Sequence, residues 1–190
     1  MKLNEKRLIK VLKPYFLKAR AGDWQHALRV VKWVKELGVV GENNLDLLVT
    51  AAYVHDIGWS GVAPKGKIDL DEVLKLESKA NKNSARLIKE VLTILKFTDS
   101  EIKTINRLVA AADKHESIKA DEEIIVDADS LSKLCVEHFK EKYQPDSYVR
   151  LMELLAKEFS GRIKTPKGKK LFPKLLKELK KEVLEITNSS

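Results

Sequence analysis

The chain has 190 residues, of which 44% are hydrophobic and 34% are charged. This length allows a substantial buried core in a single domain, and the composition excludes a disordered chain and a membrane-embedded protein. The net charge is +8, and the single cysteine, Cys135, excludes an intrachain disulfide framework and a cysteine-rich zinc site. The N-terminus lacks the apolar segment of a signal peptide, so we expect a soluble cytoplasmic protein.

Helical periodicity runs along the chain, and no segment has a convincing strand pattern. An apolar stripe predicts a first helix around residues 8–15, and Asp23 is expected to cap a second helix that ends before Gly38. Residues 45–57 are apolar on nearly all sides, so this helix should be central and buried. A glycine-rich loop follows at 58–67. Further helices are expected at 70–94, 99–115, from 122 onwards, 147–159 and 170–187, which gives an all-α bundle of seven to nine helices.

The positive charge is concentrated at the two ends of the chain. Residues 1–20 and residues 161–190 each sum to +6, and the segment between them sums to −4. Basic ends are compatible with nucleic-acid binding, but lysine dominates them and aromatic residues for base stacking are few. We therefore interpret them as solvated faces of two amphipathic helices that pack against each other or cover the same side of the core.

Histidines and aspartates that can bind a metal lie in apolar surroundings on three helices. His55 and Asp56 end the most apolar helix, and His26 lies on the apolar stripe of the preceding helix. The apolar segment IIVDADSL contributes Asp127 and Asp129. A buried carboxylate without a partner is costly, and carboxylate and imidazole ligands together suit a divalent metal. The pattern therefore predicts a metal site, although periodicity alone does not choose between the two aspartates of IIVDADSL.

The ordered set of His26, His55-Asp56 and Asp129 resembles the H…HD…D signature of the HD-domain superfamily of metal-dependent phosphohydrolases. The contexts WQHALRVVKWVKEL, LLVTAAYVHDIG and IIVDADSL resemble the corresponding helices of that superfamily. The resemblance implies an HD-domain-like bundle in which His26, His55, Asp56 and Asp129 hold one divalent ion, which would be Mn, Co, Ni, Fe, Zn or Mg.

The resemblance covers a motif core at about 20–140. We expect a single domain over residues 1–190, with a C-terminal helical extension at 147–190. The turn and closing helix in IKTPKGKKLFPKLLKELKKEV resemble those of small HD hydrolases.

The resemblance also implies roles beyond the metal ligands. Asp56 would orient or deprotonate the attacking water. His115 would either line the pocket, where it contacts phosphate or binds a second metal, or be a satisfied core or surface histidine. The helix at 70–94 has no histidine, which departs from the two-metal pattern and favours one metal. We interpret Asp127 as a helix N-cap or a partner of a ligand, and His138 and Cys135 as packing residues.

Cations near the metal would bind the phosphate of the substrate. Lys79, a candidate catalytic cation, and Lys82 follow the loop, and Lys114 adjoins His115. In so charged a chain, surface solvation explains most single lysines equally well. Arg29 is a candidate to pair with Asp56 or with a substrate phosphate. Trp59, in the loop that should border the substrate entrance, either stacks on a substrate ring or packs beneath that loop.

The expected reaction is metal-dependent hydrolysis of a phosphate ester. The partner would be a small phosphorylated substrate, with a nucleotide favoured over nucleic acid, and no membrane. The alternative is an HD domain without catalytic activity that serves as a nucleotide-sensing or nucleic-acid-binding module. The basic ends of the chain are the feature that supports this alternative.

Overall fold

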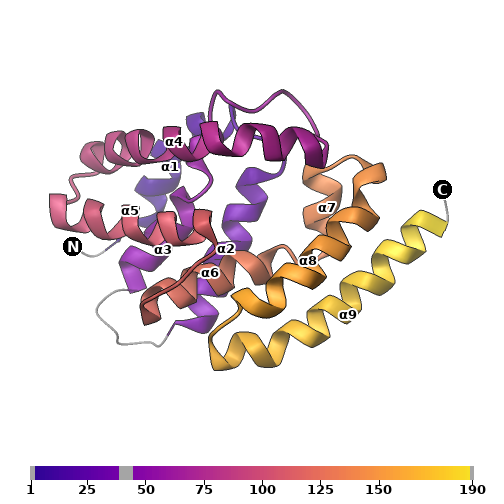
Figure 1. Cartoon of the computed structure of the whole chain (residues 1–190). Helices are drawn as coiled ribbons and strands as arrows, with labels where there is room; N and C mark the ends of the chain where they lie inside the picture. The colour runs from indigo at the N-terminus through magenta and orange to yellow at the C-terminus, as the bar shows by residue number, and fades with distance from the viewer. Residues whose placement is uncertain (1–2, 39–44, 189–190) are drawn as a thin grey trace.

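The computed structural model describes residues 3–38 and 45–188 of the chain. Within these ranges the chain forms nine α-helices, two short 3-10 helices and no β-strand (Figure 1). The predicted all-α fold is confirmed. The elements are α1 (Glu5–Phe16), α2 (Asp23–Leu37), α3 (Leu45–Val54), η1 (Ile57–Trp59), α4 (Leu70–Ile94), α5 (Asp99–Lys114), α6 (Ala120–Ser132), α7 (Val136–Lys142), η2 (Pro145–Ser147), α8 (Tyr148–Arg162) and α9 (Pro166–Asn188).

Polar side chains fix the starts of several helices. The Asn4 and Asp69 side chains accept hydrogen bonds from backbone N–H groups in the first turns of α1 and α4. Thr98 and Glu101 form a reciprocal capping box at the start of α5. These contacts satisfy N–H groups that have no partner within the helix.

Two helix boundaries differ from the periodicity in the sequence. α3 ends at Val54, so His55 and Asp56 lie in the turn that follows it rather than in the helix. The segment expected to start one helix near residue 122 instead forms α6 and α7, separated by residues 133–135. The first break allows the neighbouring side chains of His55 and Asp56 to face the same point.

Buried apolar side chains form two clusters. The first joins α1, α2, α3 and α5 with the second half of α4, and the second joins α7, α8 and α9 with the first half of α4. α6 belongs to both clusters, because Ile125 and Val126 pack in the first and Leu131 packs in the second. Asp129 lies between these residues, at the boundary of the two clusters.

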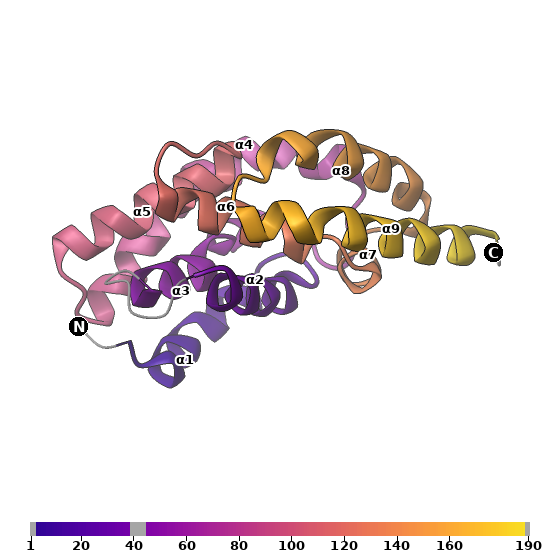
Figure 2. The same cartoon turned by 90° about the horizontal axis from the view of Figure 1, so that it is seen from below.

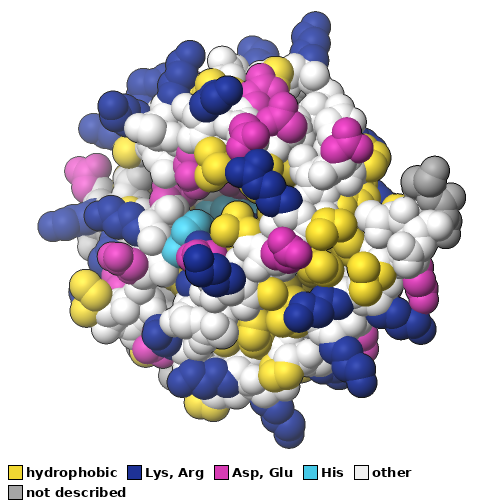
Figure 3. Space-filling view, turned by 45° about the vertical axis from the view of Figure 1, so that its right-hand side comes forward, with side chains coloured by type: hydrophobic (Ala, Val, Ile, Leu, Met, Phe, Trp, Pro, Cys, Tyr) yellow, Lys and Arg dark blue, Asp and Glu magenta, His cyan; other side chains and the backbone are white. Residues whose placement is uncertain are grey.

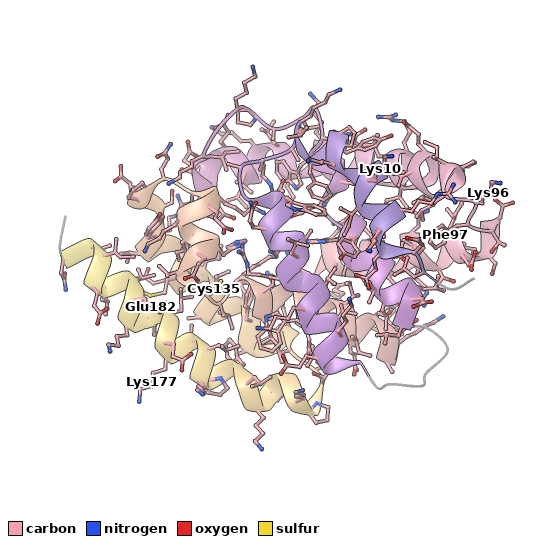
Figure 4. All side chains as sticks on the ribbon, turned by 180° about the vertical axis from the view of Figure 1, so that it is seen from behind. Lys10, Lys96, Phe97, Cys135, Lys177 and Glu182 are labelled. Atoms are coloured by element: carbon pink, nitrogen blue, oxygen red, sulfur yellow. The ribbon has the colours of Figure 1, made fainter. Side chains whose placement is uncertain are left out.

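The first and last helices lie in different clusters. Leu8 and Leu12 of α1 are buried in the first cluster, whereas Leu179 and Val183 of α9 are buried in the second. The two helices lie on different sides of the molecule (Figures 2 and 4). The expectation that they cover the same side is wrong, because each amphipathic stripe finds its own partner: α1 contacts α3, and α9 contacts α8, α6 and α7.

No helix in residues 3–38 and 45–188 combines the length and the apolar character needed to cross a membrane. The organisation as one domain with an extension stays a prediction. α8 and α9, which form that extension, pack directly on α6, the helix that carries Asp129.

Candidate metal centre

Three side chains from three segments meet at the boundary of the two clusters. His26 comes from α2, His55 from the turn after α3, and Asp129 from α6. His26 Nε2 lies 3.1 Å from both His55 Nε2 and Asp129 Oδ1. In the part of the chain that the structure describes, these three residues form a group whose ligand atoms all lie within 4.8 Å of one another. Such spacing is compatible with ligation of one ion.

Hydrogen bonds at the other nitrogen of each ring fix the position of the imidazole proton. His55 Nδ1 lies 2.8 Å from the carbonyl oxygen of Ala52, which can only accept, so Nδ1–H donates there. Ser132 Oγ donates its single hydrogen to the Asp129 carbonyl at 2.7 Å and accepts from His26 Nδ1–H at 3.1 Å. Both Nε2 atoms are left as acceptors that face each other and a carboxylate. A cation stabilises such an arrangement, so the donor set fits a metal ion.

Asp56 reaches the same point from the residue after His55. Its Oδ2 atom lies 3.6 Å from His55 Nε2 and 3.7 Å from His26 Nε2. The same oxygen accepts hydrogen bonds from Arg20 Nη2 at 2.8 Å and from Lys142 Nζ at 3.3 Å. Consecutive residues within a helix point about 100° apart, so the end of α3 before His55 is what lets both side chains turn to one side.

A buried ionic network, which the sequence did not reveal, supports Asp56. Arg20 Nε donates to Asp23 Oδ1 at 3.1 Å, and Lys142 Nζ contacts that same oxygen. The side chains of Arg20, Asp23 and Lys142 are 8%, 0% and 2% exposed. Gly22 permits this close approach of α7 to α2, since its φ is +75° and a Cβ there would lie 2.9 Å from Lys142 Cγ.

The surroundings keep both carboxylates ionised. Burial alone would raise the pKa of Asp56, but the two buried cations of the network outweigh it and hold that pKa well below its ordinary value. Burial would also raise the pKa of Asp129, but Lys133 holds it well below its ordinary value; Lys133 Nζ donates to Asp129 Oδ2 at 2.6 Å. Burial lowers the pKa of His26 well below 6.5, so its ring is neutral, the form that binds metals.

A cavity of about 300 Å³ has His55, Asp56 and Asp129 in its lining. Histidine side chains are visible in a hollow of the surface, with acidic and basic side chains around it (Figure 3). α8 supplies much of the apolar wall through Leu151, Leu155 and Phe159. The cations that line the cavity are Arg20, Lys133, Lys142 and Arg162. Each of these cations is paired with a carboxylate, so the cavity combines ion-paired charged groups with an apolar wall.

The end of α5 brings two more titratable groups to this cavity. His115 caps α5 in the left-handed conformation, with φ at 58°, and lines the cavity as the sequence suggested. Burial lowers the pKa of His115 to about 4. Asp113, which sequence reasoning missed, also lines the cavity, and burial together with the charges of Asp56 and Asp129 raises its pKa to about 8. The sequence held one signal that could have identified Asp113 as a cavity residue, which is its position two residues before His115 at the end of the same helix.

Other candidate substrate-binding residues lie elsewhere. Lys79, Lys82 and Lys114 are exposed and do not line the cavity, because they occupy solvent-facing positions of α4 and α5. Arg29 pairs with Glu141 rather than with Asp56, with its Nη1 atom 2.8 Å from Glu141 Oε2. The structure therefore does not place these four cations at the candidate site.

Trp59 lines the cavity but is buried, and the Arg20 guanidinium carbon lies 3.7 Å from the centroid of its ring. Of the segment at 58–67, Trp59 alone lines this cavity, although it belongs to the buried η1. His138, interpreted as a packing residue, also lines the cavity, with its ring centroid 4.9 Å from that of His26.

Asp127 does not cap its own helix, because it lies in the middle of α6. Its carboxylate instead accepts hydrogen bonds from the N–H groups of Lys164 and Thr165, at 2.9 and 2.8 Å, and from Thr165 Oγ1 at 2.6 Å. A Cβ on Gly168 would lie 2.5 Å from Asp127 Oδ2, so glycine is needed where α9 begins. Asp127 thus ties the start of α9 to the helix of Asp129.

Comparison with known proteins places these residues in a family. The family model described as the HD domain matches residues 23–155, which contain His26, His55, Asp56 and Asp129. No curated protein and no solved structure matches the chain.

Proposed function

The chain belongs to the HD-domain family, and we propose that it is a divalent-metal-dependent phosphohydrolase for a small phosphate ester, with a nucleotide as the substrate class. One observation carries the proposal: unprotonated Nε2 atoms of His26 and His55 converge with Asp129 beside a cavity that cations line.

His26, His55 and Asp129 would hold the ion, together with Asp56 through Oδ2. A bound divalent cation supplies Lewis-acid polarisation of a phosphoryl oxygen and lowers the pKa of water. The network around Asp56 leaves that carboxylate ionised and fixed, because the buried cations of Arg20 and Lys142 hold it from behind. Asp56 is therefore suited to orient the attacking water.

Other cavity residues would bind the substrate and move a proton. Lys133 and Arg162 line the cavity and would neutralise phosphoryl oxygens that the metal leaves free. Asp113, whose pKa is raised to about 8 chiefly by burial, is the group suited to donate a proton to the leaving alcohol oxygen. His115 is neutral at that pH and would accept or donate a hydrogen bond to the substrate.

The size and wall of the cavity support a small organic phosphate. A volume of about 300 Å³ lies at the lower end of the range for small-molecule sites, and it suits a single nucleotide better than a polynucleotide. Leu151, Leu155 and Phe159 offer an apolar surface for the body of the substrate.

Phosphate release tests the proposal. Wild-type protein would be assayed with p-nitrophenyl phosphate and a panel of nucleoside monophosphates, with Mn²⁺, Co²⁺, Ni²⁺ or Mg²⁺ and with a chelator. We expect turnover that requires a metal and is lost in His55→Gln. Metal-dependent nucleotide binding without turnover would instead support the noncatalytic, nucleotide-sensing alternative.

A further inference from the structure

A second and larger cavity shares Arg20 with the cavity at the candidate metal centre. Its volume is about 800 Å³, within the range of small-molecule sites. The end of α1, the link at 17–22, the start of α2 and the segment at 61–66 form its walls. Gly61 N–H donates to the Lys18 carbonyl at 2.8 Å, which joins two of these walls. Arg20 is the one described residue that lines both cavities.

The charged residues that line this second cavity are all basic. Lys13, Lys18 and Lys65 line it in addition to Arg20, and no acidic residue of the described chain does. The three lysines are exposed and form no ion pair with any residue in 3–38 or 45–188. Arg20 differs, since its guanidinium is engaged by Asp23 and Asp56. The lysines therefore provide positive charge that the protein leaves uncompensated, which favours an anionic ligand.

Apolar side chains lie beside these cations. Leu17 is 78% exposed, although it lines the cavity, and Phe16 and the half-buried Trp24 line it as well. Binding of a ligand that covers a large exposed leucine is favourable, by about 25 cal/mol per Å² of apolar surface removed from water. The combination of a bare leucine and uncompensated lysines matches a ligand with both an apolar body and a negative charge.

We propose that this second cavity binds a small amphipathic anion. The apolar body lies against Leu17 and Trp24, and a phosphate, carboxylate or sulfonate group lies among Lys13, Lys18 and Lys65. This site is separate from the metal-binding residues, and the proposal does not depend on the reaction in the other cavity. The Arg20 side chain would connect a ligand in this cavity to the candidate metal centre, because Arg20 lines the cavity and donates to Asp56 Oδ2 at 2.8 Å.

A matched pair of dyes tests the required chemistry. 8-Anilino-1-naphthalenesulfonate has an aromatic body and one negative charge, and N-phenyl-1-naphthylamine has the same body without the charge. Fluorescence titration of wild-type protein should show saturable binding of the anionic dye. The variant Lys13→Gln/Lys18→Gln/Lys65→Gln should bind it about tenfold more weakly, at roughly a twofold loss per exposed charge, and should bind the neutral dye unchanged.

Two further variants make the result specific. Lys103→Gln/Lys157→Gln/Lys174→Gln removes the same net charge at exposed positions outside the cavity and should leave both affinities unchanged. Leu17→Ser should weaken both dyes, because it removes apolar surface that each would cover. The measurements would be repeated in His55→Gln, where unchanged binding separates this site from any failure of the metal centre.

Three results would overturn the proposal. The two triple variants could weaken the anionic dye equally, which would mean that net charge alone governs its binding. The neutral dye could weaken as much as the anionic dye in the first triple variant. The third is the absence of saturable dye binding together with co-sedimentation on phosphatidylglycerol vesicles, which would indicate a membrane-contacting surface. Because all substituted lysines are exposed, circular dichroism should show that each variant keeps its helical content.

Discussion

Lys142 forms an ion pair inside the protein with Asp56, its Nζ atom 3.3 Å from Asp56 Oδ2, although 86 positions separate the two residues. Nζ also contacts Asp23, whose side chain is fully buried. The pair links α7 to the turn that follows α3, so the segment that carries two candidate metal ligands is held from behind by the second half of the chain.

Replacing Lys142 by Met should destabilise the protein by about 3–5 kcal/mol, because it leaves buried carboxylates without one of their two cations. Urea unfolding of the metal-free protein measures this directly. Lys140→Met, two residues earlier and exposed, is the matched control and should change the unfolding free energy by less than about 0.5 kcal/mol. Equal unfolding midpoints for the two variants would show that the buried pair contributes nothing.

The helical framework and the ordered candidate metal ligands were predictable from the sequence, because both depend on local patterns. Apolar periodicity indicates helices, and a histidine or aspartate within an apolar stripe indicates an inward-facing ligand. His26, His55 and Asp129 satisfy that criterion, and the structure brings them together. The division of α6 from α7 has no such signal, since residues 133–135 include neither glycine nor proline.

The cations of the site were not predictable in the same way. A chain with 36 lysines and arginines offers many equivalent candidates, and the sequence does not say which ones tertiary packing turns inward. Lys79 and Lys82 lie closer in sequence to the His55-Asp56 pair than Lys142 does, yet they face solvent. One weak signal existed, because Lys142 follows the inward-facing His138 by four positions on the same helix face.

Arg162 should contribute to substrate binding from α8. We expect Arg162→Gln to raise the KM for a phosphate monoester about tenfold, with kcat and metal content little changed, because one charge-assisted contact to phosphate is lost. Arg150→Gln removes an arginine from the same helix but outside the cavity, where it pairs with Asp71 at 2.9 Å, and should leave KM unchanged. A larger effect on kcat than on KM would assign Arg162 to the chemical step instead.

Asp127 should stabilise the junction between α8 and α9. Asp127→Asn keeps one acceptor oxygen and turns an amide NH₂ towards one of the two N–H donors at 164 and 165, so we expect a loss of about 1–3 kcal/mol. Amide hydrogen exchange should also accelerate at the start of α9. The exposed Asp146→Asn serves as the control. Unchanged exchange in Asp127→Asn would show that apolar packing alone holds α9 in place.

Glu122 should make part of the stability depend on pH. Burial would raise its pKa, but hydrogen bonds from the Ile118 and Lys119 N–H groups and from Arg107 hold that pKa below 4.5. A carboxylate with a lowered pKa in the folded state stabilises the protein above its unfolded pKa, and this stability is lost as pH falls through the folded value. At pH 7 the free energy of unfolding of the wild type should exceed that of Glu122→Gln by about 2 kcal/mol.

That difference should shrink as pH falls below 4.5, since protonated Glu122 no longer differs in charge from glutamine. Urea unfolding at pH 7, 5, 4 and 3 follows the difference. A difference in unfolding free energy between the two proteins that stays constant with pH would show that the charge of Glu122 does not contribute to stability.

The metal content of the purified protein tests the central claim most directly. Elemental analysis after dialysis against Mn²⁺ or Ni²⁺, followed by removal of unbound ion, should give about one ion per chain in wild type. His115→Gln should keep that ion, because His115 is outside the group of converging ligand atoms. His55→Gln should lose it while keeping its helical content. Wild-type protein without metal, or His55→Gln with as much metal as wild type, would contradict the account, and two ions per chain would contradict the mononuclear centre.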